Sequence, residues 1–239
     1  MSTIHINQLP NAMYQSILNY ISPREAAVTV QSVQKSWQHL TRNDRCLDLS
    51  NSKIKDTDLE QIFIKYQNQD NRVVVVSLDL SDCAGISDMG LQYVAVASLT
   101  SLETLNLRGS RITDDGLPYL IPLRSLEELD LSRSRQIGNK GFQYVASLTS
   151  LKKLSLGCTR ITDDDLPYLI PLRSLEELNI SCSGVTSKGL EHLTSLTSLK
   201  KLDLTGTRIA HVPDSLSHVD CLTTIHSYFM STARKMQSL

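Results

Sequence analysis

The sequence of 239 residues predicts an α/β solenoid, a single-file stack of units that each contain one short strand and one short helix. The first observation behind this prediction is an internal duplication. The phrase ITDDGLPYLIPLRSLEEL at Ile112 to Leu129 returns as ITDDDLPYLIPLRSLEEL at Ile161 to Leu178, with Gly116 replaced by Asp165. The second is a shorter pattern, LxxLxL, which recurs inside and around the duplication at steps of about 23 to 27 residues.

The LxxLxL pattern predicts where the core and the exposed sheet face lie. Side chains alternate in direction along a strand, so the fourth and sixth positions of each copy point into one core and the third and fifth face outward. Because one copy cannot cover its own leucines, neighbouring copies are expected to stack and pair their strands in parallel. A half-copy at 47–49 begins the array, and a degenerate copy at 222–225 ends it. The full copies start at Val75, Leu102, Leu126, Leu151, Leu175 and Leu199.

This period and pattern resemble the leucine-rich repeats, which form horseshoe-shaped solenoids with concave strands and convex helices. The segment SLDLSDCAGISDMGL, from Ser77 to Leu91, is similar to the cysteine-containing subclass. The ninth position of each copy is expected to satisfy backbone groups where the chain leaves the strand. The residues there are Cys83, Ser110, Ser134, Thr159, Ser183 and Thr207.

The segments between strands predict short convex helices. Thr or Asp stands where a helix would begin, as in Thr113-Asp114. Pro118 is tolerated only in a first helical turn, and Pro122 disfavours helix at the residue before it. We therefore expect convex helices of about two turns or fewer.

Residues 1–45 break the repeat pattern and show helical spacing of apolar residues instead. We expect a small all-α head at 1–45, leucine-rich repeats, about six to eight, at 46–225, and a helical cap at 226–239. Four short blocks in the head share a recognisable spacing: Leu9-Pro10, Ile17-Leu18, Tyr20-Ile21-Ser22-Pro23 and Val33-Gln34-Lys35-Ser36-Trp37. With these blocks the head resembles an F-box, although Ala12 stands where that family often has Glu, and Ala26 or Ala27 where it usually has Leu.

An F-box followed by leucine-rich repeats resembles the substrate receptor of an SCF (Skp, cullin, F-box) ubiquitin ligase. The resemblance implies a protein without catalytic activity, whose head binds a Skp-type linker and through it a cullin, while the repeats hold the protein to be ubiquitinated. The implied linker contacts are Leu9, Pro10, Ile17, Leu18 and Ile21, with Val33 and Trp37 holding the helices together or reaching the linker. The alternative is a free-standing interaction scaffold or inhibitor with the head as a cap, including a bacterial or viral effector acting in a host cell.

Composition indicates the cellular compartment and the class of partner to expect. The net charge is -1, from 24 basic and 25 acidic residues, which gives no general attraction to nucleic acid or an anionic membrane. Five cysteines without CxxC spacing suit a reducing compartment, so we expect a cytoplasmic protein. We expect no cofactor and no metal. The sequence contains no phosphate loop, GxSxG or HExxH motif, and we expect no catalytic residue.

The predicted partner-binding surface is the concave sheet face with one rim of the array. Concave candidates at the fifth and seventh positions are Asp79, Asn106, Asp130, Asp203 and Arg108. Because this face has almost no aromatic residues, arginine is expected to supply the concentrated binding energy. One hypothesis is that the rim binds an acidic or phosphorylated segment. The alternative is a solvated edge, whose arginines pair with Asp114, Asp115, Asp163 and Asp164. The rim arginines are Arg111, Arg133, Arg135, Arg160 and Arg208, with Arg108 beside them.

Two further patterns concern neighbouring repeats. The third positions alternate in charge, which predicts attraction between adjacent strands; they are Glu128, Lys153, Glu177 and Lys201. Cys158 and Cys182 both occupy the eighth position, so their side chains are expected to be close. A disulfide or half of a metal site would be compatible with this spacing, but small residues at a tight turn explain it more simply because no histidine completes a zinc site.

Overall fold

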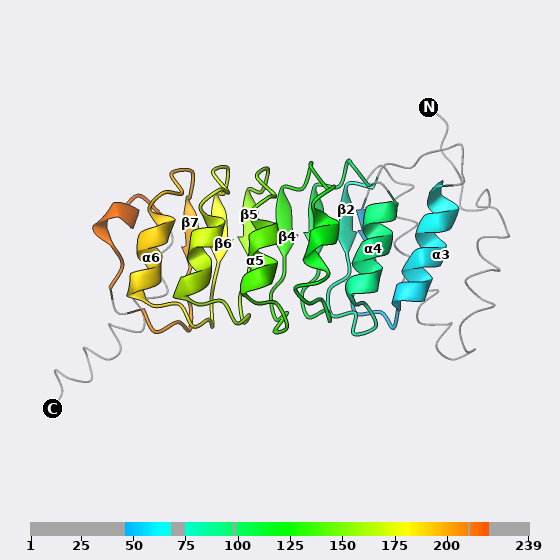
Figure 1. The fold of residues 1–239 in the computed structure, drawn as a ribbon, viewed down its shortest axis with the longest axis horizontal. Coiled ribbons are helices and arrows are strands. Elements are labelled where there is room, and N and C mark those ends of the chain that lie inside the picture. Colours follow the sequence, from blue (N-terminus) through cyan, green and yellow to red (C-terminus); the bar gives the residue numbers. More distant parts are fainter. Residues whose placement is uncertain (1–45, 68–74, 98, 210, 220–239) are drawn as a thin grey trace.

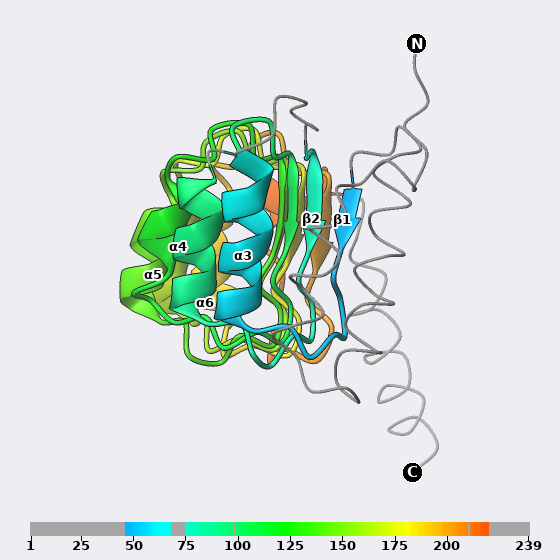
Figure 2. The ribbon, with the colours of Figure 1, turned by 90° about the vertical axis from the view of Figure 1, so that its right-hand side faces the viewer.

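The computed structural model describes residues 46–67, 75–97, 99–209 and 211–219. These residues form an α/β solenoid with one seven-stranded parallel sheet, whose strands follow chain order from β1 to β7 (Figure 1). Figure 2 shows the sheet on one side and the helices on the other. The predicted head at 1–45, the copy at 222–225 and the cap at 226–239 lie outside the described residues. The strands are β1 (Cys46–Asp48), β2 (Ser77–Asp79), β3 (Thr104–Asn106), β4 (Glu128–Asp130), β5 (Lys153–Ser155), β6 (Glu177–Asn179) and β7 (Lys201–Asp203).

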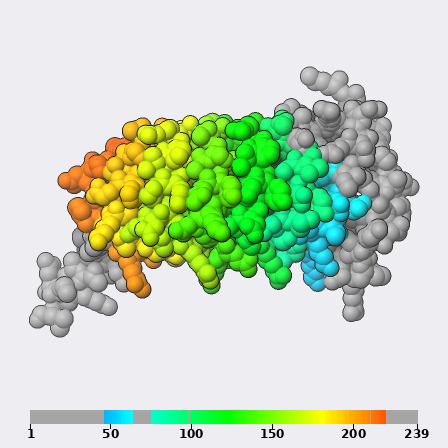
Figure 3. All heavy atoms as spheres, in the orientation of Figure 1, coloured from blue at the N-terminus to red at the C-terminus, as the bar shows by residue number. Residues whose placement is uncertain are grey.

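The strands pair in the register that the leucine pattern predicts. Fourth-position leucines lie opposite one another from Leu47 in β1 to Leu202 in β7, and each is no more than 2% exposed. The sixth positions are also buried, which confirms the predicted core. Figure 3 shows the repeats in single file along the array, in the order of the sequence.

From α4 (Asp88–Val96) onward the convex side alternates between α-helix and 3-10 helix, whereas α4 follows another α-helix, α3 (Asp56–Gln67). Both copies of LPYL, with their proline, form 3-10 helix and the intervening repeat forms an α-helix, so the 49-residue duplication spans one helix of each kind. The prediction of two turns or fewer is wrong for α3, of 12 residues, and α4, of 9, neither of which contains proline. The elements are α3 (Asp56–Gln67), α4 (Asp88–Val96), η2 (Leu117–Leu120), α5 (Asn139–Val145), η3 (Asp163–Leu169), α6 (Ser187–Leu193) and η4 (Asp214–Leu216).

The chain leaves every strand through a left-handed residue at the eighth position. The φ angles there run from 52° at Asn51 to 72° at Gly206. Glycine adopts this conformation without a steric cost and Asn or Asp tolerates it, whereas it costs other residues roughly 1–2 kcal/mol, so stacking of the repeats imposes the turn at Arg133, Cys158 and Cys182. The residues at this position are Asn51, Asp82, Gly109, Arg133, Cys158, Cys182 and Gly206.

Some of the ninth-position side chains donate hydrogen bonds to backbone carbonyls, and others do not. The hydroxyls of Thr159 and Thr207 donate to the carbonyl three residues earlier, at 2.6 and 2.7 Å. The Cys83 thiol instead donates to the carbonyl of Leu49 in the preceding repeat, at 3.0 Å, and burial raises the pKa of that thiol. The prediction is wrong for Ser110 and Ser134, whose buried hydroxyls have no hydrogen-bond partner.

Aspartates at the start of the convex segments join successive repeats. Asp88 accepts hydrogen bonds from the backbone N–H and the hydroxyl of Thr113, at 2.8 and 2.6 Å. Asp163 accepts the same pair from Thr186, at 2.7 and 2.6 Å. Asp56 binds Ser87 in this way, and Asp114 binds the backbone of Gly138. Each carboxylate therefore satisfies a turn one repeat further along the chain.

Candidate functional site

The outward face of the sheet carries a shallow groove of about 420 Å³, which we call the sheet groove. It crosses five strands, β3 to β7, and third- and fifth-position side chains stand on its surface. Ten of the fourteen lining residues are polar or charged, as the alternation along each strand predicts, although carbon atoms make up most of the exposed lining surface. The polar side chains are Thr104, Asn106, Glu128, Asp130, Lys153, Ser155, Glu177, Asn179, Lys201 and Asp203.

Fifth-position carboxylates and amides have a structural role that sequence analysis did not predict. In Asp79 and Asp130 one side-chain oxygen accepts the backbone N–H two residues later, at 2.8 and 2.7 Å. Asn106 and Asp203 do the same, at 3.1 and 2.9 Å. Asp79 uses its second oxygen to accept from the amide of Asn106, at 3.1 Å. These predicted binding residues therefore end the strands as well as line the exposed sheet face.

Oppositely charged side chains join adjacent strands at the second and third positions. Lys153 pairs with Glu128 at 2.7 Å and Lys201 with Glu177 at 2.8 Å, which confirms the predicted attraction for these two neighbours. Lys153 and Glu177 form no salt bridge, but the hydrogen bond with Glu128 and, to a lesser extent, the charge of Glu177 raise the pKa of Lys153, so this pair attracts as well. A parallel row joins Lys152 to Glu127 and Lys200 to Glu176, both at 2.7 Å.

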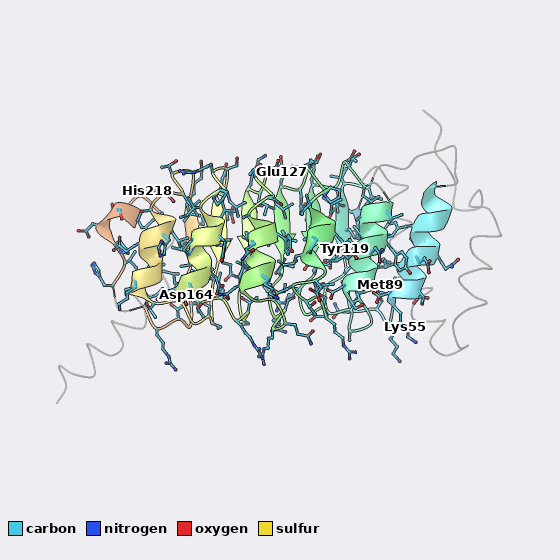
Figure 4. All side chains as sticks on the ribbon, viewed as in Figure 1. Lys55, Met89, Tyr119, Glu127, Asp164 and His218 are labelled. Atoms are coloured by element: carbon cyan, nitrogen blue, oxygen red, sulfur yellow. The ribbon has the colours of Figure 1, made fainter. Side chains whose placement is uncertain are left out.

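These rows define one edge of the array, where the strands begin. We call it the amino edge; Figure 4 shows Glu127 there, with Lys55 and Asp164 on the opposite, carboxyl edge. Because Lys200 donates a hydrogen bond to Glu176, the pKa of that carboxyl lies below its ordinary range. The hydrogen bond with Glu127 raises the pKa of Lys152.

The carboxyl edge carries the predicted rim arginines. Arg111, Arg135, Arg160 and Arg208 occupy the tenth position of their repeats and are exposed, as is Arg133 at the eighth. Sequence analysis missed Lys53, which occupies the tenth position of the first repeat and is also exposed. The tenth-position cations, which we call the cationic row, are Lys53, Arg111, Arg135, Arg160 and Arg208.

The alternative in which these arginines pair with nearby aspartates is not observed among the described residues. Asp114 and Asp163 accept hydrogen bonds from the next repeat instead. The four salt bridges within the described ranges all lie on the amino edge. Arg108, at the seventh position, is half-buried, and its Nε is buried without a hydrogen-bond partner.

Cys158 and Cys182 are adjacent, as predicted. A hydrogen bond with the Cys158 thiol raises the pKa of Cys182, and both residues have left-handed backbones at a tight turn. Both thiols are free. In the described part of the chain, no group of three or more histidine, cysteine or acidic side chains is placed to hold a metal ion.

A row of tyrosines on the convex side was missed by sequence analysis. Tyr93, Tyr119 and Tyr168 pack against the core while partly exposed, and Tyr144 is 38% exposed. Figure 4 shows Tyr119 on the convex side, between the two edges. The repeated order of an apolar residue, any residue and tyrosine in four successive repeats was the available signal. Gln143 donates to the Tyr168 hydroxyl at 3.3 Å, so at least one of these tyrosines links neighbouring repeats.

The predicted linker contacts are not placed by the structure. Leu9, Pro10, Ile17, Leu18, Ile21, Val33 and Trp37 all lie outside the described residues. No helix among the residues that are described is both long and apolar enough to cross a membrane.

Comparison with known proteins identifies the repeats. Residues 74–95, 98–120, 123–146, 147–166 and 172–194 match the family described as leucine-rich repeat. An internalin (inlF) from Listeria monocytogenes is 25% identical, with a TM-score of 0.54 over 72% of this chain. The match covers 52% of that protein, so the chain spans about half of its length. An internalin C2 (inlC2) from the same organism is 21% identical, with a TM-score of 0.55 over 81% of this chain and 90% of the other. The fold is therefore a leucine-rich-repeat solenoid.

Proposed function

We propose that this protein is a non-catalytic scaffold that binds another protein across the sheet groove. The observation that carries the proposal is the groove itself, because polar side chains from five successive strands converge on one continuous surface. Strands about 4.8 Å apart give that surface a width of about 19 Å from β3 to β7. This is large enough for a segment of a folded partner rather than for a small molecule alone.

The chemistry of the groove favours a polar partner surface. Asp130 and Asn179 each use one side-chain oxygen on the backbone and retain further groups for hydrogen bonds across the groove. The ion pairs of Lys153 and Lys201 fix the positions of two amino groups along its amino side. Such a surface combines directed hydrogen bonds with burial of the carbon atoms of its lining, so complementarity of the polar groups with the partner decides specificity.

A blocking substitution tests this proposal. Ser155, on β5 at the centre of the groove, is replaced by tryptophan, which adds bulk without entering the core. Ser125→Trp is the matched control, because that serine is exposed and lies outside the groove. Partners are captured from lysate of expressing cells and quantified by mass spectrometry. Loss of a captured protein with Ser155→Trp but not with Ser125→Trp supports binding in the groove, whereas identical capture by both variants and the wild type contradicts it.

A second candidate is the substrate receptor of an SCF ubiquitin ligase, which the F-box-like pattern of residues 9–44 favours. The free-standing scaffold takes precedence because the matched family covers only the repeats and the similar structures are internalins. A cytoplasmic location is part of both proposals. Binding of the full chain to a purified Skp-type linker separates them. The ligase candidate requires binding that is lost in a Leu9→Ala, Pro10→Ala variant, and a wild-type chain that does not bind the linker excludes it.

A further inference from the structure

The cationic row has a repeat geometry of its own. Lys53, Arg111, Arg135, Arg160 and Arg208 occupy equivalent positions just after their strands, so they lie along the carboxyl edge, with Ala84 and Gly184 at the same position after β2 and β6. From the first repeat to the seventh there are six steps of about 4.8 Å, which gives a row about 29 Å long. An extended peptide of roughly nine residues covers the same length.

The charges of this row are not neutralised within the described residues. No member forms a salt bridge there, in contrast to the amino edge, where Lys152, Lys153, Lys200 and Lys201 are all paired with glutamates. Among the carboxylates closest in sequence, Asp56, Asp114 and Asp163 accept hydrogen bonds that hold the next repeat. Rotating these three toward the row would break those bonds, and the exposed Asp115 and Asp164 form no salt bridge with it in the described part of the chain. The row therefore remains available to an external anion.

We propose that the cationic row binds an extended anionic segment of a protein partner, which runs along the carboxyl edge across the repeats. The inference rests on the proposed function and names the chemistry of its partner. Arginine's planar guanidinium binds carboxylate or phosphate oxygens through two parallel hydrogen bonds, so aspartate, glutamate or phosphoserine side chains all match the row.

The carboxylates of the neighbouring sheet face favour a narrow anionic ligand over a broad one. Asp79, Asp130 and Asp203 stand at fifth positions beside the edge, and the whole chain has a net charge of -1. A broad polyanion, such as duplex nucleic acid or a membrane surface, would meet these carboxylates as well as the arginines. A single extended segment contacts the row without crossing the sheet face.

The test uses the full chain and fluorescent peptides of ten residues. One peptide is all glutamate, a second alternates phosphoserine and glycine, and an all-glutamine peptide is the neutral reference; binding is followed by fluorescence anisotropy. The variant is Arg111→Gln with Arg160→Gln, equivalent positions in the two copies of the duplication. Its matched control is Arg124→Gln with Arg173→Gln, which are also equivalent and exposed but precede the next strands, so the loss of charge is identical.

We expect the Arg111→Gln, Arg160→Gln pair to weaken binding of at least one anionic peptide about 2- to 30-fold, and the control pair to leave it unchanged. Arg111→Lys with Arg160→Lys should retain most of the binding, and the tighter peptide identifies the source of the negative charge. Equal weakening by both glutamine pairs overturns the inference, as does tighter binding of duplex DNA. If the peptides bind through the row but Ser155→Trp leaves partner capture intact, only the sheet groove proposal fails; the reverse result removes only this inference.

Discussion

The two copies of the duplicated segment, 112–129 and 161–178, use different carboxylates to hold the threonine that begins the convex segment. In the first copy, Thr113 is held by Asp88 from the preceding repeat. In the second, Asn139 occupies the place of Asp88, and Asp165 of the same repeat accepts the N–H and hydroxyl of Thr162, at 2.8 and 2.9 Å. The single difference between the copies therefore follows from a difference in the repeat before each one.

The space at this position explains why the first copy has glycine. A Cβ on Gly116 would lie 2.2 Å from Oδ1 of Asp88, so no larger residue fits while that aspartate holds Thr113. The equivalent glycines at 90, 141 and 189 face the aspartates of their preceding repeats at 2.3 to 2.6 Å. In the first described repeat, Asp58 stands at this position and accepts from the N–H of Lys55, at 2.8 Å. Each of these glycines thus faces an aspartate one repeat earlier, and Asp165 stands where the preceding repeat has Asn139 instead.

Gly116→Asp should have the largest effect on stability. The new side chain would force Asp88 away from Thr113 and place two carboxylates together in a buried site, at a cost of about 2–4 kcal/mol. The free energy of unfolding from urea titration measures this. Gly184→Asp is the control, because that glycine is exposed and a Cβ there comes no closer than 3.3 Å to a neighbouring atom. Similar losses in both variants would show that steric conflict with Asp88 is not the cause.

Adding Asp88→Asn to Gly116→Asp should recover part of that loss, because the pair then reproduces Asn139 with Asp165. We expect a coupling free energy of about 1–3 kcal/mol in a double-mutant cycle. Strictly additive effects of the two substitutions would refute the pairing of these positions.

Asp165→Gly should destabilise the second copy by about 1–3 kcal/mol, because Thr162 loses the acceptor of two hydrogen bonds. Asn139→Asp in the same chain should restore stability by supplying the carboxylate from the preceding repeat, as Asp88 does. Asn139→Asp alone, with Asp165 still present, should destabilise. Unfolding curves that rank these three chains differently would contradict the comparison.

The eighth-position residues before the two copies differ, because only the one before the second copy carries a thiol. Gly109 precedes the first copy and Cys158 the second, both with positive φ. Since the hydrogen bond with Cys158 raises the pKa of Cys182, Cys158→Ala should lower that pKa toward its ordinary value of 9.0. The thiolate fraction at pH 8 then rises, and alkylation of Cys182 by iodoacetamide should become several-fold faster by mass spectrometry. Cys46→Ala, on β1, is the control, and it should leave the rate for Cys182 unchanged.

The smallest expected effect concerns the shared ending LEEL. In the second copy, Glu176 has its pKa lowered from the ordinary value of 4.5, first by the hydrogen bond from Lys200. A lowered pKa in the folded state contributes stability above about pH 4.5, which is lost as the pH falls through the folded pKa. Lys200→Gln should move the titration of Glu176 upward in NMR spectra. Lys188→Gln, an exposed lysine on the convex side, should not.

Much of the fold could be predicted because its signal is local. Leucines at the fourth and sixth positions of LxxLxL fixed the strands, their register and the buried core. Helix length was less predictable. Pro118 lies in the first turn of η2, as expected, but Pro167 lies inside η3, whose 3-10 helix begins four residues before it. The helices α3 and α4 have no proline and extend further than expected.

The candidate site was predicted unevenly. The alternation along each strand placed Asp130 and its equivalents on the exposed face, and the position after the strands placed Arg111 and Arg160 on an edge. The pattern did not show that fifth-position oxygens also bind the backbone at the strand ends. It also did not indicate Tyr119 and the other convex tyrosines, because the LxxLxL pattern reports strand residues and these tyrosines lie on the convex side.

The sequence by itself determined the repeat, the strand register and the sign of the charge at each position, because these depend on spacing within one unit. Only the tertiary structure decided which carboxylate holds which turn, since Asp88 and Thr113 meet across repeats that are distant in sequence and adjacent in space. The same stacking decided that Asp114 and Asp163 accept hydrogen bonds from the next repeat. The cationic row is therefore not neutralised by them within the described residues. The difference between Gly116 and Asp165 is therefore explained by the contact between repeats.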